Sequence, residues 1–340
     1  MQKVECLIVG GGICGRLLQL NLEQRGISTL VYDSPSGNHC TAVAAGLANP
    51  LVGKFFTVGW RANEFFPHLA SFYANLEKRL STSFFRPRLL KRIISTAGEQ
   101  NIWLSKAHQS KYVGFCSFAH EDLVGLNTHF GVLNVLQGGE LDTRSFLEGC
   151  DSQLNTRKED IDYTKLDLTN KEYNGVTFDK IIFAEGHKLR DNPIWNKYIK
   201  VVPTKGELLV IETDLEPHGS IYLGSVFMQH LCDNRWRVGS TYNKNDATLH
   251  PTAMMKDDLV TKLEKVLQLP YKVIDHYCGI RPASVDRKPL LGEHPEYKNS
   301  YVVNGMGSKA VSMAPVLVDE LVDYMYGEGE LHESVLLNRF

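Results

Sequence analysis

The chain of 340 residues is 43% hydrophobic and 22% charged, which is the composition of an ordinary globular protein long enough for two domains. Its formal net charge of −2 gives no overall attraction to DNA or to anionic lipid, and this balance favours a small-molecule partner. The seven cysteines are far apart without a Cys-x-x-Cys pair, so we expect no disulfide framework and no metal site. Neither a secretion signal nor a run of about 18 apolar residues is present, so we expect a cytoplasmic protein with no transmembrane segment.

The N-terminal segment has the pattern of a strand, a helix and a second strand. Residues 4–9 form a short apolar run, and the apolar residues over 13–20 then repeat at helical spacing. Gly26 ends the predicted helix, and residues 28–32 return to a strand that leads into Asp33. This order predicts a βαβ unit and therefore a parallel sheet.

Later segments alternate between helical and strand-like patterns, without an internal repeat or a low-complexity tract. A long helix is expected over 60–80, with a kink or a late start at Pro67. The other predicted helices cover 99–108, 142–150, 252–267 and 311–326. The other predicted strands cover 89–94, 112–118, 178–184, 208–212, 220–227, 236–240 and 301–303.

A glycine-rich loop stands where the first strand gives way to the first helix. In the stretch LIVGGGICGRLLQL, Gly10 permits a tight turn, Gly12 lets backbone amides approach a pyrophosphate, and Gly15 lets the helix pack on its strand. Asp33 ends the second strand, where a carboxylate can accept hydrogen bonds from both hydroxyls of a ribose. The loop predicts a dinucleotide site; a glycine-rich turn without a ligand is the structural alternative, and the loop alone does not separate NAD from FAD.

Three further segments are informative as a set. They are TAVAAGLANP (41–50), CGIRPASVDRKPLLG (278–292) and NGMGSKAVSMAP (304–315). The first has few bulky side chains, so its backbone can run alongside a large planar ring. Each segment alone also fits a surface loop or a simple turn, whereas the three together with the glycine loop form a specific combination.

With these segments the chain resembles the D-amino acid oxidase superfamily of FAD-dependent amine oxidoreductases, the group that contains glycine oxidase and sarcosine oxidase. The resemblance covers nearly the whole chain and is weakest over 85–140. It implies an α/β fold (α+β overall), with a Rossmann-like FAD-binding domain and an inserted, mainly antiparallel substrate-binding domain. The expected FAD-binding domain is discontinuous, over 1–84, 141–202 and 278–340, and the expected substrate-binding domain covers 85–140 and 203–277.

The resemblance also implies how FAD is held. The candidate cofactor-binding residues are Gly10, Gly12, Ile13, Cys14, Gly15, Asp33, Ser34, Thr41, Ala42, Ala45, Gly46, Leu47, Ala184, Gly186, Gly279, Arg281, Gly305, Met306, Gly307, Ser308 and Lys309. Amides at the start of the last helix, helped by Lys309, would stabilise the negative charge of a reduced flavin. Val43 stands where covalently flavinylated relatives have a histidine, and residues 301–340 contain no cysteine, so non-covalent FAD is expected.

The candidate catalytic residues are Arg281, Tyr222 and Tyr242. A guanidinium group can bind a carboxylate through two parallel hydrogen bonds, and the matching arginine does this in glycine-oxidase-like members of the group. The competing interpretation is that Arg281 pairs with Asp286 or Glu293. Both tyrosines lie in the region of the expected substrate-domain sheet, where they would either orient the ligand or pack in the sheet.

The expected reaction is oxidation of the C–N bond of a small amine or amino acid, of the glycine, sarcosine or D-amino acid type, by hydride transfer to flavin N5. This chemistry needs neither a catalytic triad nor a metal. The electron acceptor stays open among oxygen, a quinone and a partner protein. Three features depart from the glycine-oxidase pattern. Ser308 and Lys309 occupy the neighbourhood of a second arginine, and Ala310 replaces the glycine that usually follows. Glu185 replaces a small residue beside the expected adenosine pocket.

Alternative functions belong to other classes. The segments ANP, AEGHK and GSKAVSMAP also resemble the flavin domain of the bifunctional enzyme that removes a carboxymethyl group from carboxymethylaminomethyl-uridine in tRNA. Under that alternative the partner is tRNA, which the net charge does not favour. The remaining alternatives are a non-catalytic or electron-transfer flavoprotein and an NAD-dependent dehydrogenase.

Overall fold

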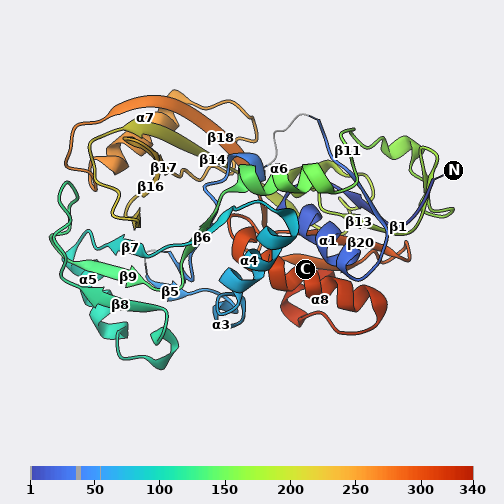
Figure 1. Ribbon diagram of the computed structural model, residues 1–340, viewed down its shortest axis with the longest axis horizontal. Helices are drawn as coiled ribbons and strands as arrows, with labels where there is room; N and C mark the ends of the chain where they lie inside the picture. The colour runs from blue at the N-terminus through green and yellow to red at the C-terminus, as the bar shows by residue number, and fades with distance from the viewer. Residues whose placement is uncertain (1, 36–39, 54, 340) are drawn as a thin grey trace.

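The computed structural model describes residues 2–35, 40–53 and 55–339, and it has two lobes, each built around one large sheet (Figure 1). The N- and C-terminal elements share the lobe on the right of Figure 1, whereas the middle of the chain supplies the lobe on the left. In the described part of the chain no helix combines the length and the apolar character needed to cross a bilayer.

The first lobe contains a mainly parallel sheet with the strand order β11-β2-β1-β13-β20-β19, and the short strand β12 also pairs with β13. Its strands are β1 (Gln2–Val9), β2 (Thr29–Tyr32), β11 (Thr156–Arg157), β12 (Glu172–Tyr173), β13 (Val176–Phe183), β19 (Leu290–Glu293) and β20 (Ser300–Asn304). Strands β1, β2, β11, β13 and β20 run parallel, and β19 and β12 pair antiparallel. With helix α1 (Ile13–Gln24) between β1 and β2, the predicted βαβ unit is confirmed.

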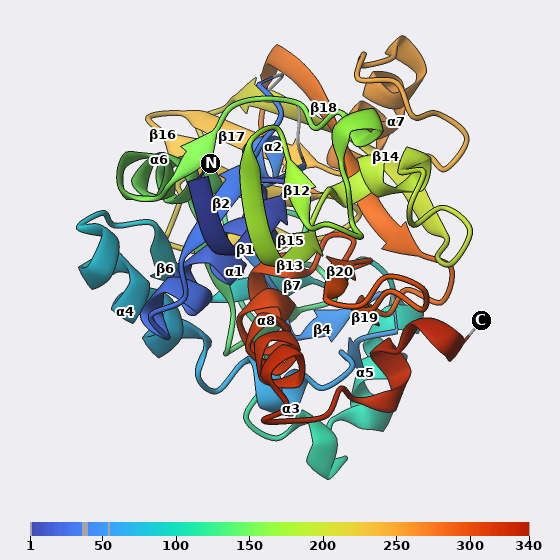
Figure 2. The same cartoon turned by 90° about the vertical axis from the view of Figure 1, so that its right-hand side faces the viewer.

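Both faces of this parallel sheet are covered, as its nearly continuous apolar strands require. Helices α1 and α8 (Ala310–Tyr326) pack side by side on one face (Figure 2), where Cys6 and Ile8 of β1 join their core. On the other face Leu7 and Val9 pack with Trp195 and its neighbours. Each of these buried apolar side chains contributes about 1.5–3 kcal/mol to folding. The carboxyl end of β1 is thereby fixed, and the glycine loop begins there.

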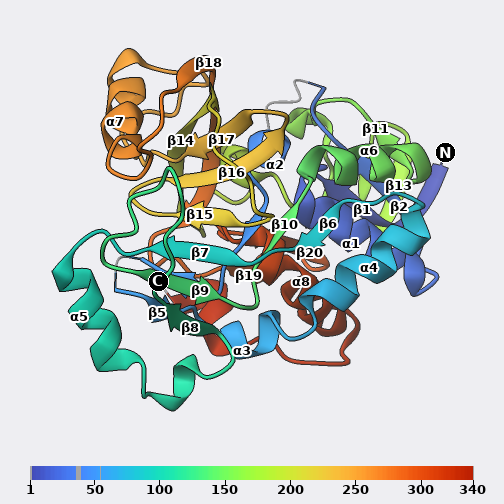
Figure 3. The same ribbon diagram turned by 60° about the vertical axis from the view of Figure 1, so that its left-hand side comes forward.

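The second lobe contains a mainly antiparallel sheet with the strand order β18-β14-β17-β16-β15-β7-β9-β8, in which only the β15–β7 pair is parallel among the described strands. Its strands are β7 (Leu90–Ile93), β8 (Cys116–Ala119), β9 (Val132–Val135), β14 (Val201–Glu212), β15 (Ile221–Leu223), β16 (Phe227–Cys232), β17 (Arg235–Gly239) and β18 (Lys272–Ser284). Figure 3 shows helix α7 (Ala253–Leu263) beside the β14 end and helix α5 (Ala97–Lys106) beside the β8 end.

Short elements connect the two lobes. The strands β3 (Leu47–Ala48), β6 (Phe85–Pro87) and β10 (Gly139–Leu141) form a small sheet, and β4 (Leu51–Val52) pairs with β5 (Thr57–Val58). The remaining helices are α2 (Cys40–Val43), α3 (Ala62–Phe65), α4 (Leu69–Leu80) and α6 (Thr143–Gln153). This arrangement places α2 against β18 and α6, between the two large sheets.

Some predicted elements differ from the structure. The single helix expected over 60–80 is two helices, α3 and α4, because Pro67 lacks the amide hydrogen that a continuous helix needs there. The strand expected over 220–227 is divided between β15 and β16, and Gly224 lies in the turn that joins them. The last predicted helix, over 311–326, is confirmed as α8, which begins at Ala310 and contains Pro315.

The expected domain boundaries stay a prediction. Most strands of the two large sheets come from the expected segments, but β14 begins at Val201, before the boundary expected at residue 203, and β18 runs through the boundary expected at residue 278. It pairs with β14 along its length, from Val201 opposite Ser284 to Glu212 opposite Lys272. This long pair of strands connects the two lobes and carries the GIRP motif towards the first lobe.

Candidate active site

A large cavity of about 1300 Å³ lies where the carboxyl ends of the parallel strands meet the β14–β18 pair. It is lined by the glycine loop, the end of β2, the small-residue segment, the turn after β13, the GIRP segment and the loop before α8. Segments that are far apart in the sequence therefore form one wall. Of the candidate cofactor-binding residues, the ones that line this cavity are Gly10, Gly12, Ile13, Cys14, Asp33, Ser34, Thr41, Ala45, Gly46, Leu47, Ala184, Gly186, Gly279, Arg281, Gly305, Met306, Gly307, Ser308 and Lys309.

Gly15 and Ala42 are the candidates that do not line the cavity. A Cβ atom on Gly15 would lie 1.8 Å from the carbonyl oxygen of Gly10, so this glycine lets α1 pack against the end of β1. Its position supports the packing role expected for the third glycine of the fingerprint. Ala42 is exposed, because it lies on the outer side of the short helix α2.

Asp33 stands at the carboxyl end of β2 and is 5% exposed. Its Oδ1 accepts a hydrogen bond from the amide of Gly11 at 2.8 Å, and its Oδ2 lies 3.0 Å from the Lys158 ammonium. The carboxylate thus holds the glycine loop in place while it lines the cavity. Lys158 was not predicted from the sequence, because it approaches Asp33 from a distant loop after β11.

The small-residue segment is held from both sides. The hydroxyl of Thr41 accepts a hydrogen bond from the Ile13 amide at 3.1 Å, which ties α2 to the glycine loop. Gln229 of β16 donates to the carbonyl of Ala45 at 3.0 Å and to Glu140 at 2.9 Å. We did not predict Gln229 and Glu140 from the sequence. The signal that could have identified each of them is a polar residue within a buried strand.

The loop before α8 is fixed by hydrogen bonds of the Asn304 side chain and of the backbone. Asn304 donates through its side-chain amide to the Gly186 carbonyl at 2.9 Å, and its side-chain oxygen accepts from the Gly305 amide at 2.7 Å. The Gly307 amide donates to the Pro282 carbonyl at 3.0 Å. These bonds bring together the turn after β13, the GIRP segment and the terminal glycine loop, as the family resemblance implied.

Lys309 immediately precedes α8 and lines the cavity. Burial lowers the pKa of its ammonium, and the nearby charge of Arg287 lowers it further. In the described part of the chain the Lys309 ammonium has no hydrogen-bond or ion-pair partner. The cavity wall therefore carries a half-buried cation that is suited to an anionic ligand group.

Glu185 lies at another part of the cavity, directly after β13. The hydroxyl of Tyr163 donates to its Oε1, and the Asn192 amide donates to its Oε2 at 2.6 Å. Burial raises the pKa of the Glu185 carboxyl to about 7, although both hydrogen bonds and the charge of Lys188 act in the opposite direction. Glu185 is thus a titratable group at the side of the cavity where Asp33 also lies.

Arg281 extends from β18 into the cavity at the side of the substrate-domain sheet. It donates to the Ser240 hydroxyl at 2.6 Å and to the Thr241 carbonyl at 3.1 Å, and its guanidinium carbon lies 4.2 Å from the centroid of the Tyr242 ring. A Cβ atom on Gly206 would meet the guanidinium group at 2.2 Å, so this glycine makes room for it. Both hydrogen-bond partners of Arg281 are neutral groups, so they hold the guanidinium without neutralising its charge.

The competing interpretation of Arg281 as an ion-pair partner is wrong. Asp286 pairs with Arg339 at 2.9 Å, and Glu293 pairs with Lys298 at 3.5 Å. Among the described residues Arg281 has no carboxylate partner.

The two candidate tyrosines lie in different environments. Tyr242 lines the cavity and is 68% exposed. Tyr222 is fully buried in the core under the antiparallel sheet, where its ring stacks on Trp236 with centroids 5.8 Å apart. The suggestion that Tyr222 orients a ligand is therefore corrected, because its side chain points into the core and does not line the cavity.

A family model described as FAD dependent oxidoreductase (DAO) matches residues 5–324 of the chain. The chain belongs to the DAO family of FAD-dependent oxidoreductases. This membership decides between the two dinucleotides that the glycine loop left open, so FAD is the cofactor and the NAD-dependent dehydrogenase alternative is excluded.

Curated relatives of this DAO-family chain include two proteins of known name. The tRNA 5-methylaminomethyl-2-thiouridine biosynthesis bifunctional protein MnmC of Idiomarina loihiensis is 20% identical over 94% of this chain. The match covers 55% of that protein, so the chain spans about half of its length. The glycine oxidase of Bacillus licheniformis is 20% identical over 96% of this chain and 94% of its own length.

Solved structures show the same fold. The glycine oxidase of Geobacillus kaustophilus superimposes with a TM-score of 0.85 at 16% identity, and the match covers 100% of both chains. The iminodiacetate oxidase of Chelativorans superimposes with a TM-score of 0.78 at 18% identity, covering 98% of both chains. At these identities the likeness shows the DAO fold alone, which agrees with the predicted two-part architecture.

The residues around the cavity fit the cofactor of the DAO family. The volume of about 1300 Å³ exceeds the range of about 300–1,000 Å³ that is typical of a pocket for one small ligand. The glycine loop places residues without side chains before α1, where a phosphate group can approach the positive end of the helix. Asp33 offers an acceptor, and Lys309, which has no partner among the described residues, offers a cation at another part of the same wall.

Proposed function

We propose that this chain oxidises the C–N bond of an amine that carries a carboxylate, in the manner of an amino acid oxidase or dehydrogenase. The observation that carries the proposal is Arg281, which lines the cavity and has no carboxylate partner among the described residues. An arginine has five N–H donors in a fixed plane, so bonds to Ser240 and Thr241 leave donors for a ligand. The names of the glycine oxidase and iminodiacetate oxidase relatives support the same substrate class.

In this proposal the protein binds and orients the substrate. Arg281 binds the carboxylate, and the apolar side chains of Leu51, Leu223 and Phe227 line the cavity and exclude water from the reacting carbon. FAD, when bound, accepts the hydride that leaves the carbon next to nitrogen. The glycine loop, Asp33 and the loop over 305–309 would hold this cofactor without a covalent link. We also propose a cytoplasmic location. The electron acceptor stays open among oxygen, a quinone and a partner protein.

A second candidate function is modification of a carboxymethylaminomethyl group on tRNA. It is favoured by the match to MnmC, which covers 94% of this chain, compared with 96% for the match to glycine oxidase. Two exposed cations, Lys244 and Arg287, also line the cavity and have no ion-pair partner in the described part of the chain. Such cations are suited to a phosphate backbone.

An anaerobic substrate panel tests these functions. The FAD-loaded protein is mixed without oxygen with glycine, sarcosine, proline, D-amino acids or iminodiacetate, and flavin absorbance is followed. Bleaching by one of these compounds is the expected result, and re-oxidation in air then separates an oxidase from a dehydrogenase. Bleaching only by tRNA that carries the carboxymethylaminomethyl group would establish the second candidate. If neither reduces the flavin, both proposals are contradicted and an electron-transfer role is favoured.

A further inference from the structure

Strand β14 presents different chemistry on its two faces. Successive side chains of a strand point to opposite faces, and Thr204 and Gly206 line the cavity while Lys205 and Glu207 point away from it. Lys205 is fully buried, and Glu207 is 1% exposed. Two charged side chains are thus enclosed behind the part of the cavity wall from which Arg281 extends.

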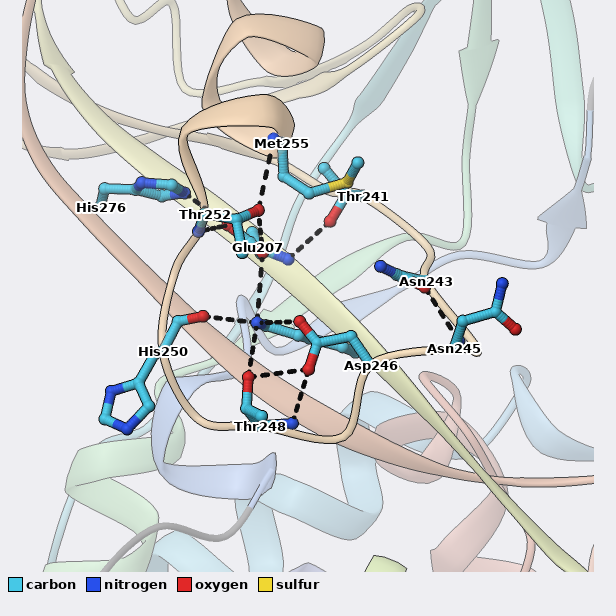
Figure 4. Close-up of polar contacts among 11 residues, drawn as sticks. Glu207, Thr241, Asn243, Asn245, Asp246, Thr248, His250, Thr252, Met255 and His276 are labelled. Carbon is cyan, nitrogen blue, oxygen red and sulfur yellow. Dashed lines mark hydrogen bonds and ion pairs between the residues drawn. The ribbon is translucent and has the colours of Figure 1, made fainter.

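Lys205 is the centre of a polar network that holds the loop after β17. Figure 4 shows the loop residues of this network, Asp246, Thr248 and His250, close to one another. Its ammonium lies 2.6 Å from an Asp246 carboxylate oxygen and 3.2 Å from the Thr248 hydroxyl, and it donates to the His250 carbonyl. Burial lowers the pKa of Lys205, but the bond to Asp246 and the charge of Glu207 outweigh this effect, so its pKa is raised and the ammonium stays charged. One side chain therefore binds three alternate residues of the loop, at positions 246, 248 and 250.

The backbone strengthens this attachment. The Lys205 amide donates to the Asn243 carbonyl at 2.8 Å, and the Asn243 amide donates to the Lys205 carbonyl at 2.9 Å. Glu207 accepts from the Thr252 amide at 2.9 Å, and the Glu207 amide donates to the Thr241 hydroxyl at 2.9 Å. The loop over 240–252 is consequently fixed to β14 at both ends and in the middle.

The same loop holds Arg281 on the cavity side. It supplies the Ser240 hydroxyl, the Thr241 carbonyl and the Tyr242 ring, which contact the guanidinium group. We infer that Lys205 is a positioning residue, which fixes the loop over 240–252 from behind the sheet and thereby sets the orientation of Arg281 for a carboxylate. The inference deepens the proposed function and rests on it.

A buried charge is suited to this role because its geometry is demanding. A charged group in a dry environment is stable only when its partners stay in place, and removal of one partner leaves an uncompensated charge. The Lys205 ammonium thus favours the one loop conformation that brings Asp246, Thr248 and the His250 carbonyl together. An apolar side chain at this position would tolerate several loop conformations.

The test uses the FAD-loaded protein and glycolate, a carboxylate that lacks the amine of glycine. The variants are Lys205→Met, the milder Asp246→Asn, and Arg281→Lys. Lys91→Met is the matched control, because Lys91 is a largely buried lysine of the same sheet that pairs with Glu121. Dissociation constants are measured from the glycolate-induced change in flavin absorbance, and deuterium uptake is measured over residues 241–252. If Lys205→Met does not fold with FAD, Asp246→Asn supplies the same readouts.

We expect Lys205→Met and Asp246→Asn to raise the Kd of glycolate at least tenfold and to increase deuterium uptake over 241–252, whereas Lys91→Met changes neither. In the Arg281→Lys background, Lys205→Met should have no further effect on Kd, because it acts through the arginine.

Unchanged glycolate affinity in both loop-network variants, with weaker binding in Arg281→Lys, would overturn the inference and leave the proposed function standing. Unchanged affinity in Arg281→Lys itself would overturn both. An effect of Lys205→Met that is equally large in the Arg281→Lys background would show a general structural role and would also overturn the inference.

Discussion

The guanidinium carbon of Arg281 lies 4.2 Å from the centroid of the Tyr242 ring, and both residues line the same cavity. The ring covers one face of the arginine, while the Ser240 hydroxyl and the Thr241 carbonyl hold its edge. A planar cation stacked in this way loses little freedom when it binds a carboxylate, because its orientation is already set. The contact with Arg281 explains the role of the exposed Tyr242 ring, which the sequence alone did not reveal.

The Tyr242 ring should therefore matter more than its hydroxyl. We expect Tyr242→Ala to raise KM for a carboxylate-bearing substrate about threefold to tenfold, since a cation–π contact contributes about 0.5–1 kcal/mol at an exposed site and more when it is desolvated. Tyr242→Phe keeps the ring and should behave like the parent protein. Steady-state kinetics measure both variants, and equal losses in the two would show that the hydroxyl, not the stacked ring, is the important group.

Gly15 should tolerate no side chain. A Cβ atom there would lie 1.8 Å from the Gly10 carbonyl oxygen, so Gly15→Ala must move α1 away from the end of β1. We expect a loss of at least about 3 kcal/mol in unfolding free energy, together with a loss of bound FAD, because overpacking against backbone has no flexible side chain to relieve it. Denaturant unfolding and flavin content after purification measure the two effects.

The matched control for Gly15 is Gly98→Ala in α5. A Cβ atom on Gly98 would meet the Thr96 hydroxyl at 3.7 Å, which is ordinary contact. This variant should be as stable as the parent protein or slightly more stable, because alanine is the better helix former by about 0.5–1 kcal/mol. A flavin-loaded, fully stable Gly15→Ala protein would contradict the packing role of the third glycine.

These glycines illustrate which parts of the structure were accessible from the sequence. The change from strand period to helix period at the glycine loop predicted the βαβ unit, and the position of Asp33 after the second strand predicted its place in the cavity. Such features depend on local pattern. The meeting of the GIRP segment with the terminal glycine loop came from the family resemblance, and the bond from Gly307 to the Pro282 carbonyl shows how the chain achieves it.

Other features depend on distant contacts that no local pattern contains. Tyr222 and Tyr242 both belong to the region of the predicted substrate-domain sheet, but only the folded structure shows that Tyr222 stacks on Trp236 in the core. Lys158 reaches Asp33 across 125 positions of sequence. The role of Gln229 behind the small-residue segment likewise requires the two lobes to be assembled.

Asn304 should couple the last parallel strand to cofactor binding. It donates to the Gly186 carbonyl and accepts from the Gly305 amide, so Asn304→Ala releases two cavity-lining turns at once. We expect the Kd of FAD to rise about tenfold, which corresponds to about 1.4 kcal/mol, the scale of one or two buried hydrogen bonds. Fluorescence titration of the apoprotein with FAD measures the change.

The control for Asn304 is Asn170→Ala, since Asn170 is exposed and bonds to Asp167 away from the cavity. It should leave the Kd of FAD unchanged. Equal affinities in both variants would mean that the turns after β13 and β20 are held by other contacts.

Glu185 should make the stability of the FAD-free protein depend on pH. Burial raises the pKa of this carboxyl from 4.5 to about 7 in the folded protein. The folded state therefore keeps a proton that the unfolded chain releases, and the stability that Glu185 contributes below pH 4.5 is lost as pH rises to about 7. The contribution is on the order of 3 kcal/mol at most, because one pKa unit corresponds to about 1.4 kcal/mol.

Glu185→Gln removes this titration and keeps a side chain of the same shape. Urea unfolding of the parent protein and the variant at pH 5 and pH 8 should show a smaller loss of unfolding free energy with pH in Glu185→Gln. Parallel pH profiles for the two proteins would contradict the raised pKa of the Glu185 carboxyl.

The central claim of the proposed function is that Arg281 holds the substrate carboxylate beside the DAO-family cofactor. The most direct measurement is anaerobic rapid mixing of the FAD-loaded protein with matched pairs of compounds, such as glycine with methylamine and sarcosine with dimethylamine, which differ only by the carboxylate. We predict that at least one amino acid reduces the flavin, and that its partner amine does so at least about 30-fold more slowly, the scale of about 2 kcal/mol for a charge-assisted pair. Equal reduction rates within each pair, or an unreduced flavin with every compound, would contradict the account.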